Sequence, residues 1–366
     1  MGENKSITFL LPRTGENPIG GFKVIYEYGN RLIERGYTVN YVYGIVSRKD
    51  IKGFLAIGYR ILRLFRYLKY LHFKSYKPDS WFKTDKRSNH VLAYSLSEKN
   101  IPQSDVVIAS SWATAYWLND YKKVKQEQKF YFIQHFEDWH GGYDKVIKTW
   151  KMNLKKIVIA PWLQKIASEI GEKSVLIENG FNLEEFHLMN PIESRNEPIV
   201  MMLWHDNPFK GCKMGLEALE LVKEKIPNLK VILFGVPDKP QNLPEWITYY
   251  QEPERNLLRS IYNQAAVFVG SSYSEGWGLT VGEAMLCGCA VACTNNDGYT
   301  ILAKDNETAL LSEVGNSNQL ATNIITLLNH KEVRIRIANN GNLTAQKYTW
   351  DKSAEKFYQT IMATNS

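Results

Sequence analysis

Two glutamates, Glu275 and Glu283, stand eight residues apart where the sequence passes from an apolar strand through a glycine-broken turn into a helix. The turn is expected to leave backbone N–H groups available at the start of the helix, where they can receive phosphate oxygens. The two carboxylates can accept hydrogen bonds from hydroxyl groups. A ligand with both phosphate and hydroxyls suits this chemistry, and a nucleotide-sugar is the obvious candidate. Paired carboxylates on a surface turn are more often solvated or capping than catalytic, so the spacing alone leaves both interpretations open.

The length and composition favour a two-domain globular protein. A chain of 366 residues is too long for one ordinary core, and its hydrophobic content of 44% supports packed domains. We expect buried thiols in a reducing cytosol rather than disulfides or zinc, because no CxxC pair or histidine cluster accompanies the cysteines, which are Cys212, Cys287, Cys289 and Cys293. The first apolar run ends at Pro12 and is too short for a signal peptide. No later run approaches the ~18 apolar residues that span a bilayer.

Positive charge is concentrated in residues 48–87. This segment holds twelve Lys and Arg against three Asp, a net charge of +9, while the whole chain carries +7. At 100° per residue, its apolar side chains fall on one helical face and its cations gather opposite. The apolar face holds Phe54, Ile57, Ile61, Leu64, Phe65, Leu68 and Leu71, and the opposite face Lys52, Arg60, Arg63, Arg66 and Lys74.

This basic amphipathic helix has two interpretations. It can pack its apolar face on the core, or it can lie in the plane of an anionic membrane, where each cation is worth ~1 kcal/mol. In the second case the headgroup contacts would be made by Arg60, Arg63, Arg66, Lys69 and Lys74. Nucleic acid is a poorer partner, because no nucleic-acid motif accompanies the charge and the apolar face is wider than a phosphate-tracking groove requires.

Strands and helices alternate in two successive series. In the first, a strand at 7–11, a loop with Gly20 and Gly21, a helix to about residue 35 and a strand at 37–46 predict a βαβ unit, and further strands are expected at 106–109, 130–133 and 156–159. Polar residues and prolines cluster at 190–198, where we place the domain boundary. Beyond it we expect strands at 199–203, 230–234, 247–250, 267–270 and 290–294, and helices at 214–224, 256–265 and 282–287. The pattern predicts an α/β protein with two doubly wound parallel-sheet domains and a cleft between them, in which ligands bind outside the carboxyl ends of the strands.

An ordered set of segments resembles the family 4 glycosyltransferases of GT-B fold, over nearly the whole chain. These segments are Pro18-Ile19-Gly20-Gly21, Asn179-Gly180-Phe181-Asn182 with Phe186, Phe209-Lys210-Gly211, Phe234-Gly235, Tyr262-Asn263-Gln264-Ala265-Ala266 and Glu275 to Glu283, the last of which looks like the family's E-x7-E signature. The resemblance implies two Rossmann-like domains facing a cleft. Residues 1–192 would form the acceptor-side domain and 193–348 the nucleotide-sugar-binding domain, and a helix over 349–366 would cross back to the first domain.

The resemblance also implies a donor site. Glu275 would lie beside the donor sugar, Lys210 would offset charge on the diphosphate leaving group, and Glu283 would accept the ribose hydroxyls. Backbone amides would hold phosphate or sugar oxygens over Gly276, Trp277, Gly278, Leu279 and Thr280. Gly20 and Gly21 would let the backbone approach the pyrophosphate or the reacting sugar at the positive end of a helix. Without the resemblance, these features read as a loop lysine, a helix-start glutamate and a tight turn.

His135 follows the strand at 130–133, where such enzymes often carry a histidine facing the donor sugar. With Glu275 and Lys210 it completes the expected catalytic set, although a histidine after a strand is commonly structural and His140 lies nearby. Glu137, Asp138 and Trp139 are weaker candidates for binding the acceptor.

One position departs from the family pattern. Many relatives carry an arginine five residues before the Lys-Gly pair, and this chain has His205 there. A neutral imidazole is a poorer diphosphate clamp than a guanidinium. Either another basic side chain takes the place of this arginine at the donor site, or the donor pocket is degraded.

We therefore expect a retaining, hexosyl-type glycosyltransferase that moves a sugar from a nucleoside diphosphate sugar to a glycan or lipid-linked acceptor in bacterial cell-surface polysaccharide or glycolipid synthesis. We expect no metal or other cofactor, because Lys210, the loop amides and a helix end can stabilise the departing phosphate and no DxD carboxylate pair sits at a strand end. The expected location is the cytoplasm, peripheral on the inner face of the membrane. The alternatives are a catalytically silent glycan-binding or scaffold subunit of a transferase complex, and a GT-B epimerase or phosphorylase.

Overall fold

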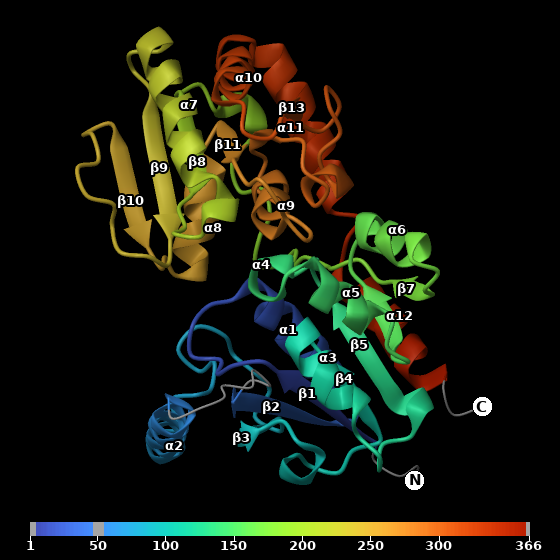
Figure 1. The fold of residues 1–366 in the computed structure, drawn as a ribbon. Coiled ribbons are helices and arrows are strands. Elements are labelled where there is room, and N and C mark those ends of the chain that lie inside the picture. Colours follow the sequence, from blue (N-terminus) through green and yellow to red (C-terminus); the bar gives the residue numbers. More distant parts are fainter. Residues whose placement is uncertain (1–4, 47–54, 364–366) are drawn as a thin grey trace. The chain divides into compact units, whose positions relative to one another are not determined.

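The computed structural model describes residues 5–46 and 55–363. The chain forms two compact units, one made of Met1–Glu178 with Trp350–Ser366 and the other of Asn179–Thr349. Each unit is built on one parallel sheet with helices connecting its strands (Figure 1). The prediction of two doubly wound α/β domains is confirmed.

The sheet of the first unit has seven strands in the order β3-β2-β1-β4-β5-β6-β7. The strands are β1 Ser6–Leu11, β2 Thr38–Val46, β3 Asn89–Ser95, β4 Val106–Ala109, β5 Lys129–Ile133, β6 Lys155–Val158 and β7 Ser174–Leu176. The helices are α1 Gly20–Glu34, α2 Leu55–Phe73, α3 Trp112–Asn119, α4 Asp138–Gly141, α5 Tyr143–Trp150, α6 Pro161–Glu169 and α12 Trp350–Met362. The strand order reverses between β1 and β4, which is where doubly wound domains bind ligands.

Helix α12, red in Figure 1, completes the core of the first unit. The ring of Phe357 stacks on Tyr28 of α1 with centroids 4.3 Å apart and meets Phe132 of β5 edge-on at 5.7 Å. Nearer the surface, Arg35 donates to Glu355 at 2.6 Å. The last helix is therefore held to the first unit by buried aromatic packing as well as by charge.

The sheet of the second unit has six strands in the order β10-β9-β8-β11-β12-β13. The strands are β8 Ile199–Leu203, β9 Lys230–Gly235, β10 Ile247–Gln251, β11 Val267–Gly270, β12 Ala290–Thr294 and β13 Leu310–Ser312. The helices are α7 Cys212–Lys225, α8 Arg255–Gln264, α9 Leu279–Leu286, α10 Ser317–Asn329 and α11 Lys331–Ala345. Here the order reverses between β8 and β11.

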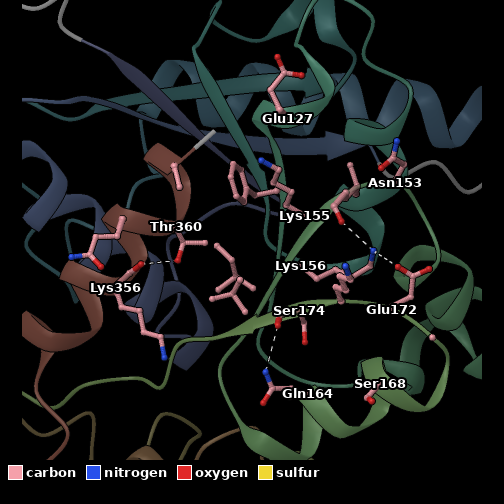
Figure 2. A pocket seen from close by; sticks show the side chains of 18 of the residues that line it. Glu127, Asn153, Lys155, Lys156, Gln164, Ser168, Glu172, Ser174, Lys356 and Thr360 are labelled. Atoms are coloured by element: carbon pink, nitrogen blue, oxygen red, sulfur yellow. Dashed lines mark hydrogen bonds and ion pairs between the residues drawn. The ribbon is translucent and has the colours of Figure 1, made fainter. Parts of the chain in front are cut away.

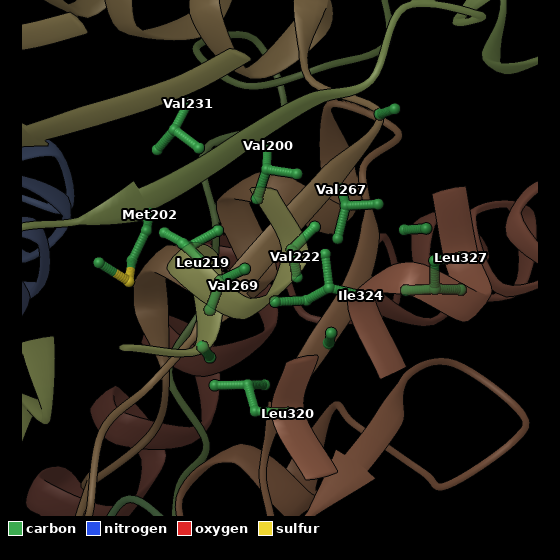
Figure 3. Packing of buried hydrophobic residues seen from close by; sticks show 14 of the residues in the cluster. Val200, Met202, Leu219, Val222, Val231, Val267, Val269, Leu320, Ile324 and Leu327 are labelled. Carbon is green, nitrogen blue, oxygen red and sulfur yellow. The ribbon is translucent and has the colours of Figure 1, made fainter. Parts of the chain in front are cut away.

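Figure 3 shows the core that holds β8 and β11 against their covering helices. Val200 of β8 and Val269 of β11 pack with Val222 of α7 and Ile324 of α10, and all four side chains are buried. Parallel strands covered on both faces need such continuous apolar runs. This core fixes the places where the loops after β8 and β11 begin.

The chain passes from the first to the second unit between Glu178 and Asn179, whereas the sequence analysis placed the boundary at residue 192. The polar segment 190–198 belongs to the second unit because two of its side chains, Ile192 and Arg195, are buried there. The guanidinium of Arg195 donates to the carbonyl of Ala265 at 2.9 Å. The hydrophilic composition of this segment thus did not indicate that it packs within the second unit.

The elements named in the sequence analysis occur with small shifts in their ends. For example, α9 begins at Leu279 rather than at residue 282. The four cysteines are buried thiols that form no disulfide bonds. Along residues 5–46 and 55–363, no helix has both the length and the hydropathy needed to cross a membrane.

Candidate active site

The fold places Lys210 and Glu275 at the reversal point of the second sheet. Lys210 follows β8 and Glu275 follows β11, and these strands are parallel neighbours. The Nζ of Lys210 donates to the Oε1 of Glu275 at 2.7 Å, and the side chains are 26% and 12% exposed. The two residues predicted to work together are therefore in direct contact, and both retain access to solvent.

The loops that carry this ion pair are bonded to each other. Ser271 Oγ donates to the carbonyl of Lys210 at 2.9 Å, and the backbone N–H of Tyr273 donates to the carbonyl of Phe209 at 2.7 Å. Gly211, between Lys210 and α7, has a φ of +60°, and a Cβ there would lie 2.1 Å from the carbonyl oxygen of Ser271. Only glycine fits where these two loops approach each other. Glycine is therefore required after Lys210 for steric reasons, and the lysine supplies the charge.

Residues after β12 hold Glu275 in place from the other side. Ser272 Oγ donates to Glu275 Oε1 at 2.7 Å and accepts from the hydroxyl of Tyr299 at 3.0 Å. Asn296 donates to the carbonyl of Ser272 at 3.0 Å. Gly298 lies so close that an added Cβ would be 2.3 Å from the carbonyl oxygen of Glu275. This support is not predicted from the sequence, although Asn295-Asn296-Asp297-Gly298 after a strand is a turn signature.

Helix α9 begins directly after the glycine-broken turn, as the first motif requires. Gly278 has a φ of +86° at the N-cap position, and no side chain caps this helix in the described part of the chain. The N-cap residue thus supplies no side-chain acceptor to the N–H groups of the first turn, and Leu279 and Thr280 are half-buried there.

Three other predicted donor-site residues lie in the same segment. Gly276 and Trp277 are buried, and the indole of Trp277 packs edge-on against Tyr348 with centroids 5.2 Å apart. Glu283 lies one turn into α9 and is 6% exposed. The structure brings these residues into one segment with Lys210 and Glu275, and their roles toward a donor remain predictions.

His205 lies on the loop between β8 and Lys210. Its Nδ1 accepts a hydrogen bond from the backbone N–H of Asn207 at 2.9 Å, which assigns the proton of the neutral ring to Nε2. Burial, and then the charge of Lys210, lower the pKa of His205. The residue is therefore a neutral hydrogen-bond donor near neutral pH rather than a second cation.

The first unit gathers its candidates at the carboxyl ends of β1 and β5. Gly20 and Gly21 begin α1, and the side chain of Gln134, after β5, donates to the carbonyl of Gly21 at 3.0 Å. His135 contacts the rings of Trp139 and Trp162 with centroids 4.5 and 5.4 Å away. Its Nδ1 lies 3.1 Å from the carbonyl oxygen of Phe136 and donates to it, so Nε2 is left as an acceptor.

Glu137 is the most perturbed carboxyl group of this end of the sheet. Burial raises its pKa to about 7, against the opposing effects of the Trp112 N–H, which donates to Oε2 at 3.0 Å, and of the charge on Arg13. Asp138 and Trp139 follow on the surface in the short helix α4. A carboxyl group poised near neutral pH at a ligand-binding edge is a functional-site candidate.

Helix α2 presents its apolar residues outward. Leu62, Phe65 and Phe73 are 66 to 68% exposed, and Ile61, Leu64, Leu68 and Leu71 are about half exposed. The inward side is polar and aromatic: Tyr67 meets Tyr94 edge-on at 5.8 Å, and the hydroxyl of Tyr70 donates to Glu16 at 2.6 Å. The core-packing interpretation of this helix is therefore wrong for residues 61–73.

The cations predicted beside that apolar face are only partly on the surface. Arg66, Lys69 and Lys74 are exposed and Arg63 is half-buried, while the side chain of Arg60 and residues 47–54 lie outside the described residues. No three His, Cys, Asp or Glu side chains of the described residues come together in a way that could hold a metal ion. That the protein needs no metal remains a prediction.

Part of the chain matches a known protein family. Residues 188–344 match the family model of glycosyl transferases group 1. Phosphatidyl-myo-inositol mannosyltransferase of Mycobacterium leprae is 23% identical over 246 residues, 60% of this chain and 66% of that protein. The aligned segments span 40 to 66% of the length of the first curated relatives.

Solved structures match over almost the whole chain. Sucrose-phosphate synthase of Thermosynechococcus elongatus has a TM-score of 0.72 at 17% identity, covering 97% of this chain and 98% of its own. Anabaena HepE in complex with UDP and glucose has a TM-score of 0.71 at 14% identity, covering 98% and 100%. Over residues 188–344 the chain therefore matches glycosyl transferases group 1, and its fold is that of these solved structures.

Proposed function

We propose that the chain transfers a sugar, with retention of anomeric configuration, from a nucleoside diphosphate sugar to a glycan or lipid-linked acceptor. The observation that carries the proposal is the contact between Lys210 and Glu275 at the reversal point of the second sheet, next to the uncapped start of α9. A diphosphate needs a cation and N–H donors, and a sugar needs hydroxyl acceptors. This segment offers all three.

The proposed chemistry uses groups of the second unit. As the bond between the anomeric carbon and the phosphate breaks, the phosphate oxygen keeps the electron pair and Lys210 stabilises the growing negative charge. The acceptor oxygen bonds to the same face of the sugar and gives its proton to the departing phosphate. Glu275 places a negative charge beside the developing positive charge on the ring. Lys210 and Glu275 hold these opposite charges against each other at 2.7 Å, so a bound diphosphate would compete with Glu275 for Lys210.

The complexes and names of similar proteins support the choice of substrates. HepE is described with UDP and glucose, which supports a nucleoside diphosphate sugar as donor. The mannosyltransferase of Mycobacterium leprae is named for a phosphatidyl-myo-inositol acceptor, which supports a lipid-linked acceptor. In the first unit, Glu137 in its protonated or charged form can hydrogen-bond an acceptor hydroxyl, and the exposed ring of Trp139 offers a stacking surface.

The test compares matched variants in an assay of nucleoside diphosphate release. A panel of UDP-, GDP- and dTDP-sugars is incubated with and without acceptor, and the anomeric configuration of the product is read by NMR. Glu275→Gln and Lys210→Met should each lower kcat by about 100-fold, because each removes a charge that acts in the transition state. The exposed neighbours provide controls, Glu217→Gln and Lys213→Met, which should retain parental rates. Parental turnover in Glu275→Gln would refute the assignment.

A catalytically silent subunit is the second candidate, and His205 favours it, because the site lacks the arginine of many relatives. The same panel separates the two functions. Calorimetric binding of a nucleotide-sugar without nucleoside diphosphate release, with any acceptor, supports the silent subunit. An epimerase would instead give the epimeric nucleotide-sugar, and a phosphorylase would give a sugar 1-phosphate.

The location that we propose is the inner face of a bacterial membrane, and it rests on α2. Seven large apolar side chains are exposed over residues 61–73, and Arg66, Lys69 and Lys74 lie among them on the surface. Monomeric proteins rarely expose so continuous an apolar strip in water. A helix of this composition binds in the interface of an anionic bilayer, where a lipid-linked acceptor for cell-envelope polysaccharide or glycolipid would be found.

Sedimentation with vesicles tests this location. The parent should sediment with vesicles containing anionic lipid, and the double variant Phe65→Ser, Leu68→Ser should stay in the supernatant because apolar area is lost. Leu257→Ser with Leu343→Ser is the matched control, since these side chains are 44% and 62% exposed in the second unit. Reversal of Arg66 and Lys69 to Glu should also release the protein from these vesicles. Equal sedimentation of the parent and the α2 variants would contradict the proposal.

A further inference from the structure

A large pocket opens in the first unit at the end of the sheet away from the candidate site. It has a volume of about 1680 Å³ and lies at the amino ends of β5, β6 and β7, between α6 and the end of α12. The five residues of β5 separate its two ends by roughly 13 Å. A ligand in this pocket therefore cannot be the reacting sugar at the carboxyl end of the same strand.

The pocket is basic, and some of its cations are not neutralised by the protein. Lys156 is buried and satisfied: its Nζ donates to Glu172 at 2.8 Å and to the carbonyls of Met152 and Leu154. Lys155, Lys173 and Lys356 also line the pocket and are exposed, and among the described residues no carboxylate forms an ion pair with them. In Figure 2, Lys356 and Thr360 of α12 lie on one side of the pocket, and Lys156 and Glu172 on the other.

The rest of the lining favours an oligosaccharide over other anions. The volume exceeds the 300–1,000 Å³ usual for a small molecule, so a single phosphate or sulfate would leave most of it unfilled. Amide and hydroxyl side chains suited to sugar hydroxyls recur around it, at Asn153, Gln164, Ser168, Gln359 and Thr360. Phe130 is the one aromatic residue of the lining described here, and Lys155 covers its ring at 5.6 Å, so bases of a nucleic acid would find no stacking platform.

The lining also contains a buried hydroxyl group that has no hydrogen-bond partner among the described residues. Ser174 belongs to β7, the edge strand of the sheet, and its Oγ is buried with no hydrogen-bond partner in the described structure. Buried polar groups are almost always hydrogen-bonded, to protein, water or ligand.

We propose that this pocket binds an anionic glycan chain, at a site separate from the transfer reaction. The acid groups of the glycan pair with Lys155, Lys173 and Lys356, and its hydroxyls bond to the amide and hydroxyl side chains of the walls. Binding here requires no turnover, so its failure would leave the proposed transferase function standing.

Calorimetry with defined probes tests the site. The probes are a sulfated heparin hexasaccharide, the same hexasaccharide with its sulfates removed, and inorganic sulfate. The parent should bind the sulfated glycan at least tenfold more tightly than either of the others. The triple variant Lys155→Gln, Lys173→Gln, Lys356→Gln should weaken this binding by about tenfold or more.

A matched control removes the same charge from another surface of the same unit. Lys122→Gln, Lys123→Gln, Lys148→Gln are exposed lysines outside the pocket, and this variant should bind within about twofold of the parent. An equal loss in the control would show binding by overall charge and would overturn the site. Equal affinity for inorganic sulfate, or for the desulfated glycan, would overturn the choice of an anionic glycan.

Discussion

Gly298 gives the sharpest test of how closely the second unit positions Glu275. A Cβ added at this position would lie 2.3 Å from the carbonyl oxygen of Glu275 and 2.6 Å from its Cβ. Ordinary contacts begin near 3.4 Å, so Gly298→Ala must push the loop or its neighbour by about 1 Å. The φ of −72° at Gly298 suits alanine, so the substitution acts through this contact and not through backbone strain. A displacement of about 1 Å at a reacting group can cost about 100-fold in rate, and we expect that fall in kcat.

The assay pairs transfer kinetics with thermal unfolding of the same samples. Overpacking of this kind costs roughly 1–3 kcal/mol, which lowers Tm by several degrees but leaves the protein folded at 25 °C. Gly58→Ala is the control, because a Cβ there meets nothing within 4 Å. A kcat within threefold of the parent, in a variant whose Tm has fallen, would show that the position of Glu275 does not limit the reaction and would refute the reasoning.

Three further predictions use other contacts of the two units. His205→Gln, which can still donate one hydrogen bond, should keep kcat/KM within about threefold, while His205→Ala should lose about tenfold; equal losses in the two variants would argue against a donor role. Burial raises the pKa of Glu137 to about 7, so the protonated carboxyl group contributes to the stability of the folded protein at low pH. This contribution is lost as the pH rises through 7. The parent should therefore lose Tm between about pH 5 and 8 relative to Glu137→Gln, and parallel Tm profiles would contradict this. Arg195→Met should cost ~3 kcal/mol or more in chemical denaturation, because its buried guanidinium donates to the carbonyls of Tyr262 and Ala265, whereas the exposed Arg336→Met should cost under 1 kcal/mol.

Much of the fold was predictable because buried parallel strands leave a strong signal. The runs at 199–203 and 267–270 are apolar without interruption, as strands covered on both faces must be, and they occur as β8 and β11. The domain boundary was harder. The cluster of polar residues at 190–198 has the composition of a linker, but Arg195 is buried through hydrogen bonds to carbonyls that are distant in sequence. Composition does not record such partners.

The candidate site divides in the same way. Lys210, Glu275 and the turn before α9 could be found from local patterns, because each is defined by residues close in sequence. The support for Glu275 could not, because Ser272 is fixed by Asn296 and Tyr299 from the loop after another strand. The raised pKa of Glu137 likewise comes from burial, which the sequence around it does not express.

For helix α2, the periodicity of apolar residues does not distinguish between two environments. An apolar stripe opposite a basic one predicts an amphipathic helix, but the same stripe serves a helix packed on a core and a helix lying on a membrane. Exposure argues against packing of this stripe on the core: the aromatic residues Tyr67 and Tyr70 face the protein, and Phe65 is 68% exposed. Because Tyr70 donates to Glu16, the orientation is fixed by a polar contact and not by burial of the stripe. Exposure of this apolar side to water is unfavourable. Its burial in a bilayer interface would lower the free energy of the protein.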